Sequence, residues 1–238
     1  MKKLILASAL FLTITGLARA ADMPLKAPPP PPLPAFTWTG VYGGGYVGGL
    51  WSKTDNNFVY APPASWQQTA SVGVGGGILG AQYQWGNVVF GVEGNVGATL
   101  SGDLGTAGCS PATSCLPGRT ITADSTDAIW TAGGRAGWAF GNWLPYVSGG
   151  YANASFTQTF CAPGTACLIG RSSHDGAYIG GGLDWAVWGR GLVVGLEYRH
   201  FDFQTEQVVP SAFVHNTYDT KPKFDTLTFR LTYLFSPW

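Results

Sequence analysis

The chain has 238 residues, with 13 basic and 13 acidic side chains and no formal net charge. Only 11% of the residues are charged, 14% are aromatic and 35 are glycines, whereas soluble domains carry about 25% charged residues. This composition argues against a soluble globular protein and favours a single large β-domain with much of its surface in lipid.

Residues 1–20 have the pattern of a secretory signal peptide. Lys2 and Lys3 precede an apolar run over 4–17, and Ala18-Arg19-Ala20 forms a cleavage site. The apolar run is too short for a membrane anchor. Cleavage removes three of the 13 basic residues, so the mature chain has 10 basic and 13 acidic residues. That balance argues against nucleic acid as a partner.

Residues 21–35 are rich in proline, with five consecutive prolines at 28–32. Such a run favours an extended polyproline II segment that has no core to bury. We interpret it as a periplasmic spacer before a barrel domain at 36–238, with a docking ligand for a partner domain as the alternative.

The barrel domain alternates strand-like runs with short and long connections. Strands are expected at approximately 37–51, 71–85, 87–99, 128–140, 143–156, 176–188, 191–203 and 224–235. Glycine-based tight turns are expected at 85–87, 140–143 and 188–191, and long loops at 52–70, 100–127, 157–175 and 204–222. All long loops then fall at one end of the barrel, and both termini at the other. This predicts an all-β, up-and-down, eight-stranded antiparallel transmembrane β-barrel, with periplasmic termini and extracellular loops.

Alternation along the last strand is the clearest pattern, because large apolar residues and Thr or Arg occupy opposite faces over 226–235. If charged strand residues point inward, the apolar residues of the other parity face lipid. This assigns an outward position to Val88, Phe90, Val92, Val96, Trp130, Ala132, Ala136, Trp138, Phe140, Ile179, Leu183, Trp185, Val187, Leu192, Val194, Leu196, Tyr198, Leu227, Phe229, Leu231, Tyr233 and Phe235. Phe201, Phe203 and Leu234 are exceptions to the rule, and the glycine-rich first two strands have no assigned face.

Aromatic residues mark both ends of the strands, as expected of the two lipid–water boundaries. The girdle at the short-turn end is predicted to contain Trp38, Trp85, Phe140, Trp143, Trp188 and Phe235, and the opposite girdle Trp51 and Trp130.

The inward charged set is expected to contain three acids and three bases. These residues are Glu93, Arg135, Asp184, Glu197, Arg199 and Arg230. An eight-stranded barrel is about the size that its own side chains fill, and buried charges must pair. One interpretation is a structural ion-pair network that plugs the lumen, and the other is a narrow or gated ion path.

Four cysteines lie in two of the predicted long loops, in an exported chain. Cys109 and Cys115 form one C-x5-C pair, and Cys161 and Cys167 form another. Exported chains with an even cysteine count favour disulfides. We expect local pairs within each loop, with pairing between the two loops as the alternative. The spacing does not fit a zinc site.

Candidate catalytic and cofactor motifs are weak. The G-x-G-x-x-G match at 75–80 lacks the following helix that a dinucleotide site needs. His174, His200 and His215 lack metal-ligand spacing, and the His200-Phe201-Asp202 sequence has no nearby serine on the same face. We therefore expect no catalytic, cofactor-binding or metal site.

Several motifs resemble, in the same order, the Omp25/Omp31-like outer membrane immunogenic protein family of alphaproteobacteria. They are WTGVYGG at 38–44, VFGVEG at 89–94, GRAGWAFG at 134–141, LPYVSGG at 144–150, GGGLDWA at 180–186 and LEYR at 196–199. The resemblance spans about 37–235 and implies an OmpA-like barrel of the porin-family, surface-antigen type. It carries over no catalytic residue. Family members commonly end on the aromatic that corresponds to Phe235, whereas this chain continues with Ser236-Pro237-Trp238.

These observations predict a non-catalytic protein of the Gram-negative outer membrane, with a structural and surface-exposed role. A small porin or gated pore is the alternative, a lipid-modifying enzyme is less favoured, and a secreted, soluble ligand-binding barrel is a fourth hypothesis. The expected partners are outer-membrane lipid, lipopolysaccharide and the barrel assembly machinery. The loops carry no motif that identifies a host or envelope ligand.

Overall fold

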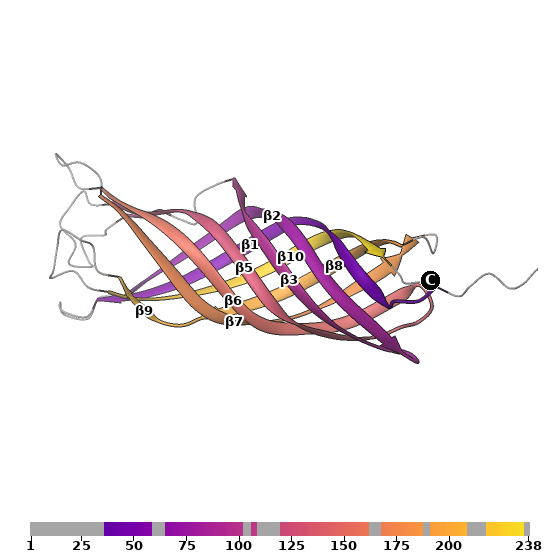
Figure 1. Ribbon diagram of the computed structural model, residues 1–238. Helices are drawn as coiled ribbons and strands as arrows, with labels where there is room; N and C mark the ends of the chain where they lie inside the picture. The colour runs from indigo at the N-terminus through magenta and orange to yellow at the C-terminus, as the bar shows by residue number, and fades with distance from the viewer. Residues whose placement is uncertain are drawn as a thin grey trace, which may run out of the picture. The chain divides into compact units, whose positions relative to one another are not determined.

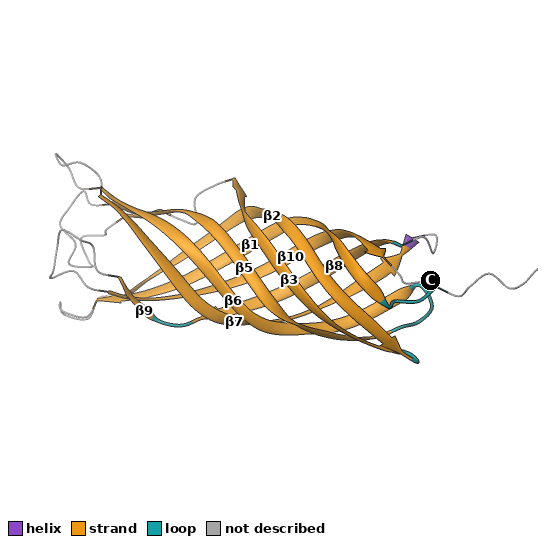
Figure 2. Cartoon of the chain, in the orientation of Figure 1, coloured by secondary structure: helices purple, strands orange, loops and turns teal. Residues whose placement is uncertain are grey.

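A computed structural model describes residues 36–58, 65–101, 106–108, 120–161, 168–187, 191–208 and 218–235. The described chain is almost entirely β-strand, wound into a tilted barrel (Figures 1 and 2). The strands are β1 (Gly40–Phe58), β2 (Ser65–Trp85), β3 (Val88–Ser101), β4 (Thr106–Gly108), β5 (Thr120–Trp138), β6 (Trp143–Cys161), β7 (Leu168–Ala186), β8 (Leu192–Phe203), β9 (Glu206–Val208) and β10 (Tyr218–Phe235).

Eight long strands close the barrel in chain order. The order is β1-β2-β3-β5-β6-β7-β8-β10, and β10 pairs back onto β1. Val41 lies opposite Phe235, and Phe58 lies opposite Tyr218 at the far end of the same ladder. Every neighbouring pair among these strands is antiparallel. Closure leaves no open sheet edge along this part of the wall, as a barrel in lipid requires.

Two tight turns define one end of the barrel, which we call the turn end. Gly86 joins β2 to β3 with a φ of 62°, and Gly141 joins β5 to β6 with a φ of 60°. Glycine adopts this left-handed conformation without the steric cost that a β-carbon brings. The opposite end, where β1 ends at Phe58 and β2 begins at Ser65, is the loop end.

The eight predicted strands are all present, but six of them were predicted too short at the loop end, whereas β8 ends at Phe203 as predicted and β3 ends within two residues of its predicted end. At the turn end the observed boundaries differ from the predicted ones by three residues or fewer. At the loop end, 52–58, 65–70, 120–127, 157–161, 168–175 and 218–223 continue the strands. The sequences of these segments are mostly polar, so they lack the apolar alternation from which strands were predicted. The short strands β4 and β9 also lie within predicted loops.

The facing of the glycine-rich strands follows from their large residues. Tyr42 and Leu50 of β1 are buried inside the barrel, whereas Val41, Val47 and Trp51 are about half exposed on its outer face. A sparse alternation is therefore present in β1, with glycine at most of the intervening positions.

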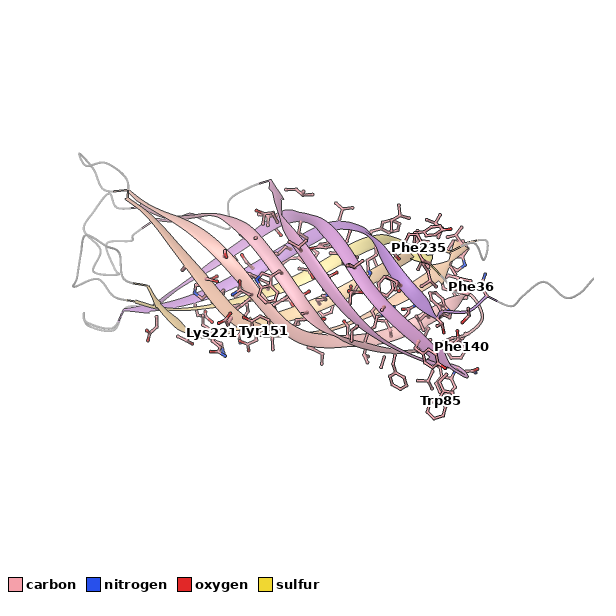
Figure 3. The ribbon with its side chains drawn as sticks, in the orientation of Figure 1. Phe36, Trp85, Phe140, Tyr151, Lys221 and Phe235 are labelled. Atoms are coloured by element: carbon pink, nitrogen blue, oxygen red, sulfur yellow. The ribbon has the colours of Figure 1, made fainter. Side chains whose placement is uncertain are left out.

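The outer face of the barrel is apolar over the middle of the strands. Figure 3 shows Trp85, Phe140 and Phe235 at the turn end, and Tyr151 farther toward the loop end. Leu79 and Ile179 are among the most exposed apolar residues, at 66% and 68%. An exposed apolar surface of this extent suits contact with lipid rather than water. In the described residues, no helix is sufficiently long and apolar to span a membrane.

Candidate functional site

The interior of the barrel, the lumen, is organised in three layers. The layer toward the loop end is apolar and contains Leu50, Val72, Val74, Ile129, Ala152, Ala154, Tyr178, Phe201, Phe203 and Phe224. The layer toward the turn end is also apolar and contains Trp38, Tyr42, Ile78, Val89, Ala139, Leu144, Ala186, Val193 and Leu234. The residues in both layers are buried. Between them lies a layer of charged residues, which we call the charge network.

Glu93 of β3 is the centre of the charge network. Its Oε1 lies 2.6 Å from Arg199 Nη2, and its Oε2 lies 2.5 Å from Arg230 Nη2 and 3.5 Å from Arg135 Nη1. Asn95 donates a 3.0 Å hydrogen bond to Oε1. One carboxylate therefore contacts three guanidinium groups. Arg135 lies on β5, which pairs with β3, whereas Arg199 and Arg230 lie on strands that do not pair with β3.

Glu197 of β8 is the second acceptor of the charge network. It forms ion pairs with Arg230 Nη1 and, at 2.9 Å, with Arg199 Nε. Ser148 donates a 3.0 Å hydrogen bond to its Oε1. Arg230 is only 2% exposed, and it also donates a 3.0 Å hydrogen bond to the hydroxyl of Tyr146. These contacts replace the water that a buried charge would otherwise need.

Asp184 of β7 pairs with Arg135, whose Nη2 lies 2.5 Å from Asp184 Oδ2. The Arg135 guanidinium also lies over the ring of Tyr146, 3.8 Å from the ring centroid. Such a cation–π contact adds to the ion pair when both groups are desolvated. Three acids and three arginines thus make a charge network with no net charge.

Glycines in the wall make room for the tyrosines that border the charge network. A β-carbon at Gly182 would lie 2.6 Å from the hydroxyl oxygen of Tyr146, and one at Gly133 would lie 2.5 Å from that of Tyr178. Each ring therefore lies against bare backbone of another strand. Glycine here permits a close approach that other residues would block.

Beside the charge network is a small cavity of about 30 Å³. Arg199, Glu197 and Asn95 line one part of it, and Ile129 and Phe201 belong to its apolar part. A volume of this size has room for about two water molecules. It is far smaller than a solute-conducting passage.

All six charged residues singled out from the sequence are brought together in the lumen. Each is buried, and each makes at least one ion pair within the charge network. The exceptions to the facing rule, Phe201, Phe203 and Leu234, are also buried in the lumen, where they belong to the apolar layers.

Two outward assignments were wrong. Trp38 is not part of the girdle at the turn end, because it is 1% exposed and its Nε1 donates a 3.1 Å hydrogen bond to the carbonyl oxygen of Gly141. It packs edge-on against Phe36 within the apolar layer. Val187 is likewise buried. Both lie just beyond the ends of strands, where alternation no longer determines the direction of a side chain.

The apolar layers are not predicted by the facing rule, because that rule places charged residues inside the barrel and large apolar residues outside it. The signal that identifies them is the switch from charged to large apolar residues on one parity of a strand. Glu197 and Arg199 are followed on the same face by Phe201 and Phe203. Such a switch predicts that the lumen is closed by packing, and not by charge alone.

The outer wall carries a second set of charges at the girdle of the loop end and beyond it. Asp225 accepts a 2.6 Å hydrogen bond from Tyr198 and lies 2.8 Å from His200 Nδ1, and Lys221 lies 3.2 Å from Asp202. On other strands, the Asp175 carboxylate accepts a hydrogen bond from the Tyr151 hydroxyl. His200 is therefore on the outer face, whereas the adjacent Phe201 is in the lumen.

The predicted disulfides lie largely outside the described residues. Cys109, Cys115 and Cys167 are not among them, and only the backbone of Cys161, at the end of β6, is described. The local pairing stays a prediction. In the described part of the chain, no group of three or more His, Cys, Asp or Glu residues is arranged to hold a metal ion. The G-x-G-x-x-G match at 75–80 lies inside β2.

Comparison with known proteins gives a match to the family described as outer membrane protein beta-barrel domain, over residues 7–235. The 31 kDa outer-membrane immunogenic protein of Brucella melitensis is 28% identical over 251 aligned positions, which cover 99% of this chain and 100% of that protein. The 25 kDa outer-membrane immunogenic protein of Brucella ovis is 34% identical over 102 residues. That match covers 41% of this chain and 47% of the Brucella protein, so it spans about half of its length.

Two solved barrels match this chain at low sequence identity. The N-terminal β-barrel domain of Pseudomonas aeruginosa OprF has a TM-score of 0.39 at 11% identity, and the match covers 77% of this chain and 97% of that one. The outer membrane protease OmpT of Escherichia coli has a TM-score of 0.45 at 10% identity, with coverage of 86% and 99%.

Proposed function

The chain belongs to the outer membrane protein β-barrel family, and from this premise we propose that it is a non-catalytic, structural barrel that keeps its own lumen closed. Its place is the Gram-negative outer membrane. In this proposal the turn end and the termini face the periplasm, and the loop end is presented at the cell surface. The barrel assembly machinery inserts it through the strand that ends at Phe235.

The observation that carries the proposal is the layered lumen. A neutral charge network lies between two apolar layers, so an ion that crosses the barrel must disrupt both packing and ion pairs. Desolvation of an ion in such an interior is expensive. The wall also provides length beyond the membrane, since several strands have 18 to 21 residues whereas about 9–11 suffice to cross a bilayer.

Support for a surface role without catalysis comes from the relatives, which are named outer-membrane immunogenic proteins. An immunogenic barrel exposes its loop end, where sequence can vary without disturbing the lumen. On the outer wall, Asp225 contacts His200 and accepts a hydrogen bond from Tyr198. We interpret this exposed His–Asp pair as a structural contact and not as part of a catalytic site.

Conductance in planar lipid bilayers tests this proposal against a small or gated pore. We expect the purified chain to give no stable open channel. We expect Arg135→Ala to lower stability without opening one, because the two apolar layers remain in place. The matched control is Val92→Ala, which truncates a residue on the outer face. A large, stable conductance from the unmodified protein, or one that rises in Arg135→Ala alone, contradicts the closed barrel and favours the pore.

A further inference from the structure

Two lysines lie directly opposite each other on the outer face of the barrel, at the junction of β1 and β10. Lys53 and Lys223 are paired in register, and Lys53 follows the outward Trp51 by two residues. The lysine pair therefore lies about 7 Å farther along the strand than this aromatic. It is just beyond the apolar middle of the outer face, which we call the apolar belt. Like charges placed directly opposite each other in an antiparallel ladder destabilise it, and an anion bound between them offsets their repulsion.

The acids around this pair are already engaged with other groups. Asp202 of β8, which lies opposite Lys223, forms its ion pair with Lys221, and Asp225 contacts both Tyr198 and His200. Asp55, opposite Lys221 in the register, has an interaction of its own. Within the described residues, neither Lys53 nor Lys223 forms an ion pair or a hydrogen bond through its ammonium group.

On the turn-end side of the lysine pair, the same outer face has an apolar groove of about 450 Å³. Its walls include Leu227, Phe229, Tyr198, Leu196, Trp185 and Trp143, and Gly181 leaves its floor without a side chain. Leu227 is four residues from Lys223 on the same face of β10, a separation of about 13 Å. The groove therefore begins about 13 Å from Lys223 along β10 and continues toward the turn end on the lipid-facing wall.

We propose that Lys53, Lys223 and this groove form a binding site for a phosphorylated lipid of the outer leaflet. The headgroup phosphate lies between the two ammonium groups, and an acyl chain lies in the groove. Charge and depth both favour this occupant, since an ammonium pair just outside an apolar belt meets the phosphates of a lipid whose chains lie within the belt. The site rests on the proposed placement of the loop end at the outer surface.

The test measures binding of bisphosphorylated lipid A and of the same lipid after dephosphorylation to the purified full chain in a neutral detergent, by native mass spectrometry. We expect the phosphorylated form to bind about tenfold more tightly. Lys53→Gln with Lys223→Gln should abolish this preference, and Lys53→Arg with Lys223→Arg should keep it. Val194→Phe, which fills the groove, should weaken binding of both lipids. Val92→Phe, on the outer face of β3, is the matched control and should leave binding unchanged.

Equal affinity for the two lipids overturns the proposal, as does an unchanged preference in the double glutamine variant. Competition by millimolar inorganic phosphate alone would identify a simple anion site and would also contradict it. The assay in detergent does not depend on orientation. Epitope tags in the 59–64 segment and in the turn at Gly86–Asn87, probed on intact cells, test the orientation separately, so the two failures are distinguishable.

Discussion

Strand β10 carries cationic side chains into two contrasting environments. Arg230 points into the lumen, where Glu93 and Glu197 neutralise it and Tyr146 accepts a hydrogen bond. Lys223 points outward beyond the apolar belt, where the residue opposite it in β1 is another lysine. The lumen must satisfy its charges from within the chain, because burial leaves no other partner. The outer wall is open to a ligand, so it tolerates a like-charge pair.

Removing the buried cation in the lumen has the largest expected effect on stability. Arg230→Met removes one cation from the charge network and leaves Glu93 and Glu197 with an uncompensated buried charge. We expect the free energy of unfolding to fall by about 3–5 kcal/mol. Urea unfolding of the purified barrel in lipid vesicles measures it, with Phe229→Leu, on the lipid-facing side of the same strand, as the control.

A double variant distinguishes the lost ion pair from simple loss of packing. Arg230→Met with Glu197→Gln restores the charge balance of the network, so its loss of stability should be smaller than the sum of the two single losses. Strict additivity of the two losses would show that Arg230 contributes by volume and not by charge.

Gly182→Val has the next largest expected effect, because it tests how tightly the lumen is packed around the charge network. The new β-carbon meets the Tyr146 hydroxyl and, at 2.7 Å, the carbonyl oxygen of Leu196. Overpacking of this kind costs about 1–3 kcal/mol. Gly181→Val is the control, since the nearest atom to its β-carbon is the Tyr146 carbonyl oxygen at 3.3 Å. Thermal unfolding that is equally affected by both substitutions would contradict a specific fit between Gly182 and Tyr146.

Lys53→Glu has the smallest expected effect and the opposite sign, since it converts the external like-charge pair into an opposite-charge pair. In lipid-free detergent we expect a gain of about 0.2–1 kcal/mol, which should shrink at high salt because the pair is exposed. Lys53→Gln separates relief of repulsion from the new attraction. A loss of stability at low salt would show that Lys53 already has a favourable partner. The same variant should lose the preference for phosphorylated lipid.

The sequence by itself determined the fold class, the places of the eight strands and the set of charges that face inward. These properties depend on local patterns. Alternation sets the facing of β3, β5, β7, β8 and β10, and glycine turns set the end at which consecutive strands meet. The extensions of the strands at the loop end were not predicted, because their sequences are mostly polar and no apolar period marks them.

Only the tertiary structure decided which charges meet. The sequence places Glu93, Arg135 and Asp184 inside, but nothing local says that Arg135 pairs with Asp184 of β7 at 2.5 Å while Glu93 reaches Arg199 and Arg230 across the lumen. Those contacts depend on strand tilt and on the cumulative register around the closed barrel. The same holds for the inward turn of Trp38 and for the alignment of Lys53 with Lys223, since both arise where distant parts of the chain meet at closure.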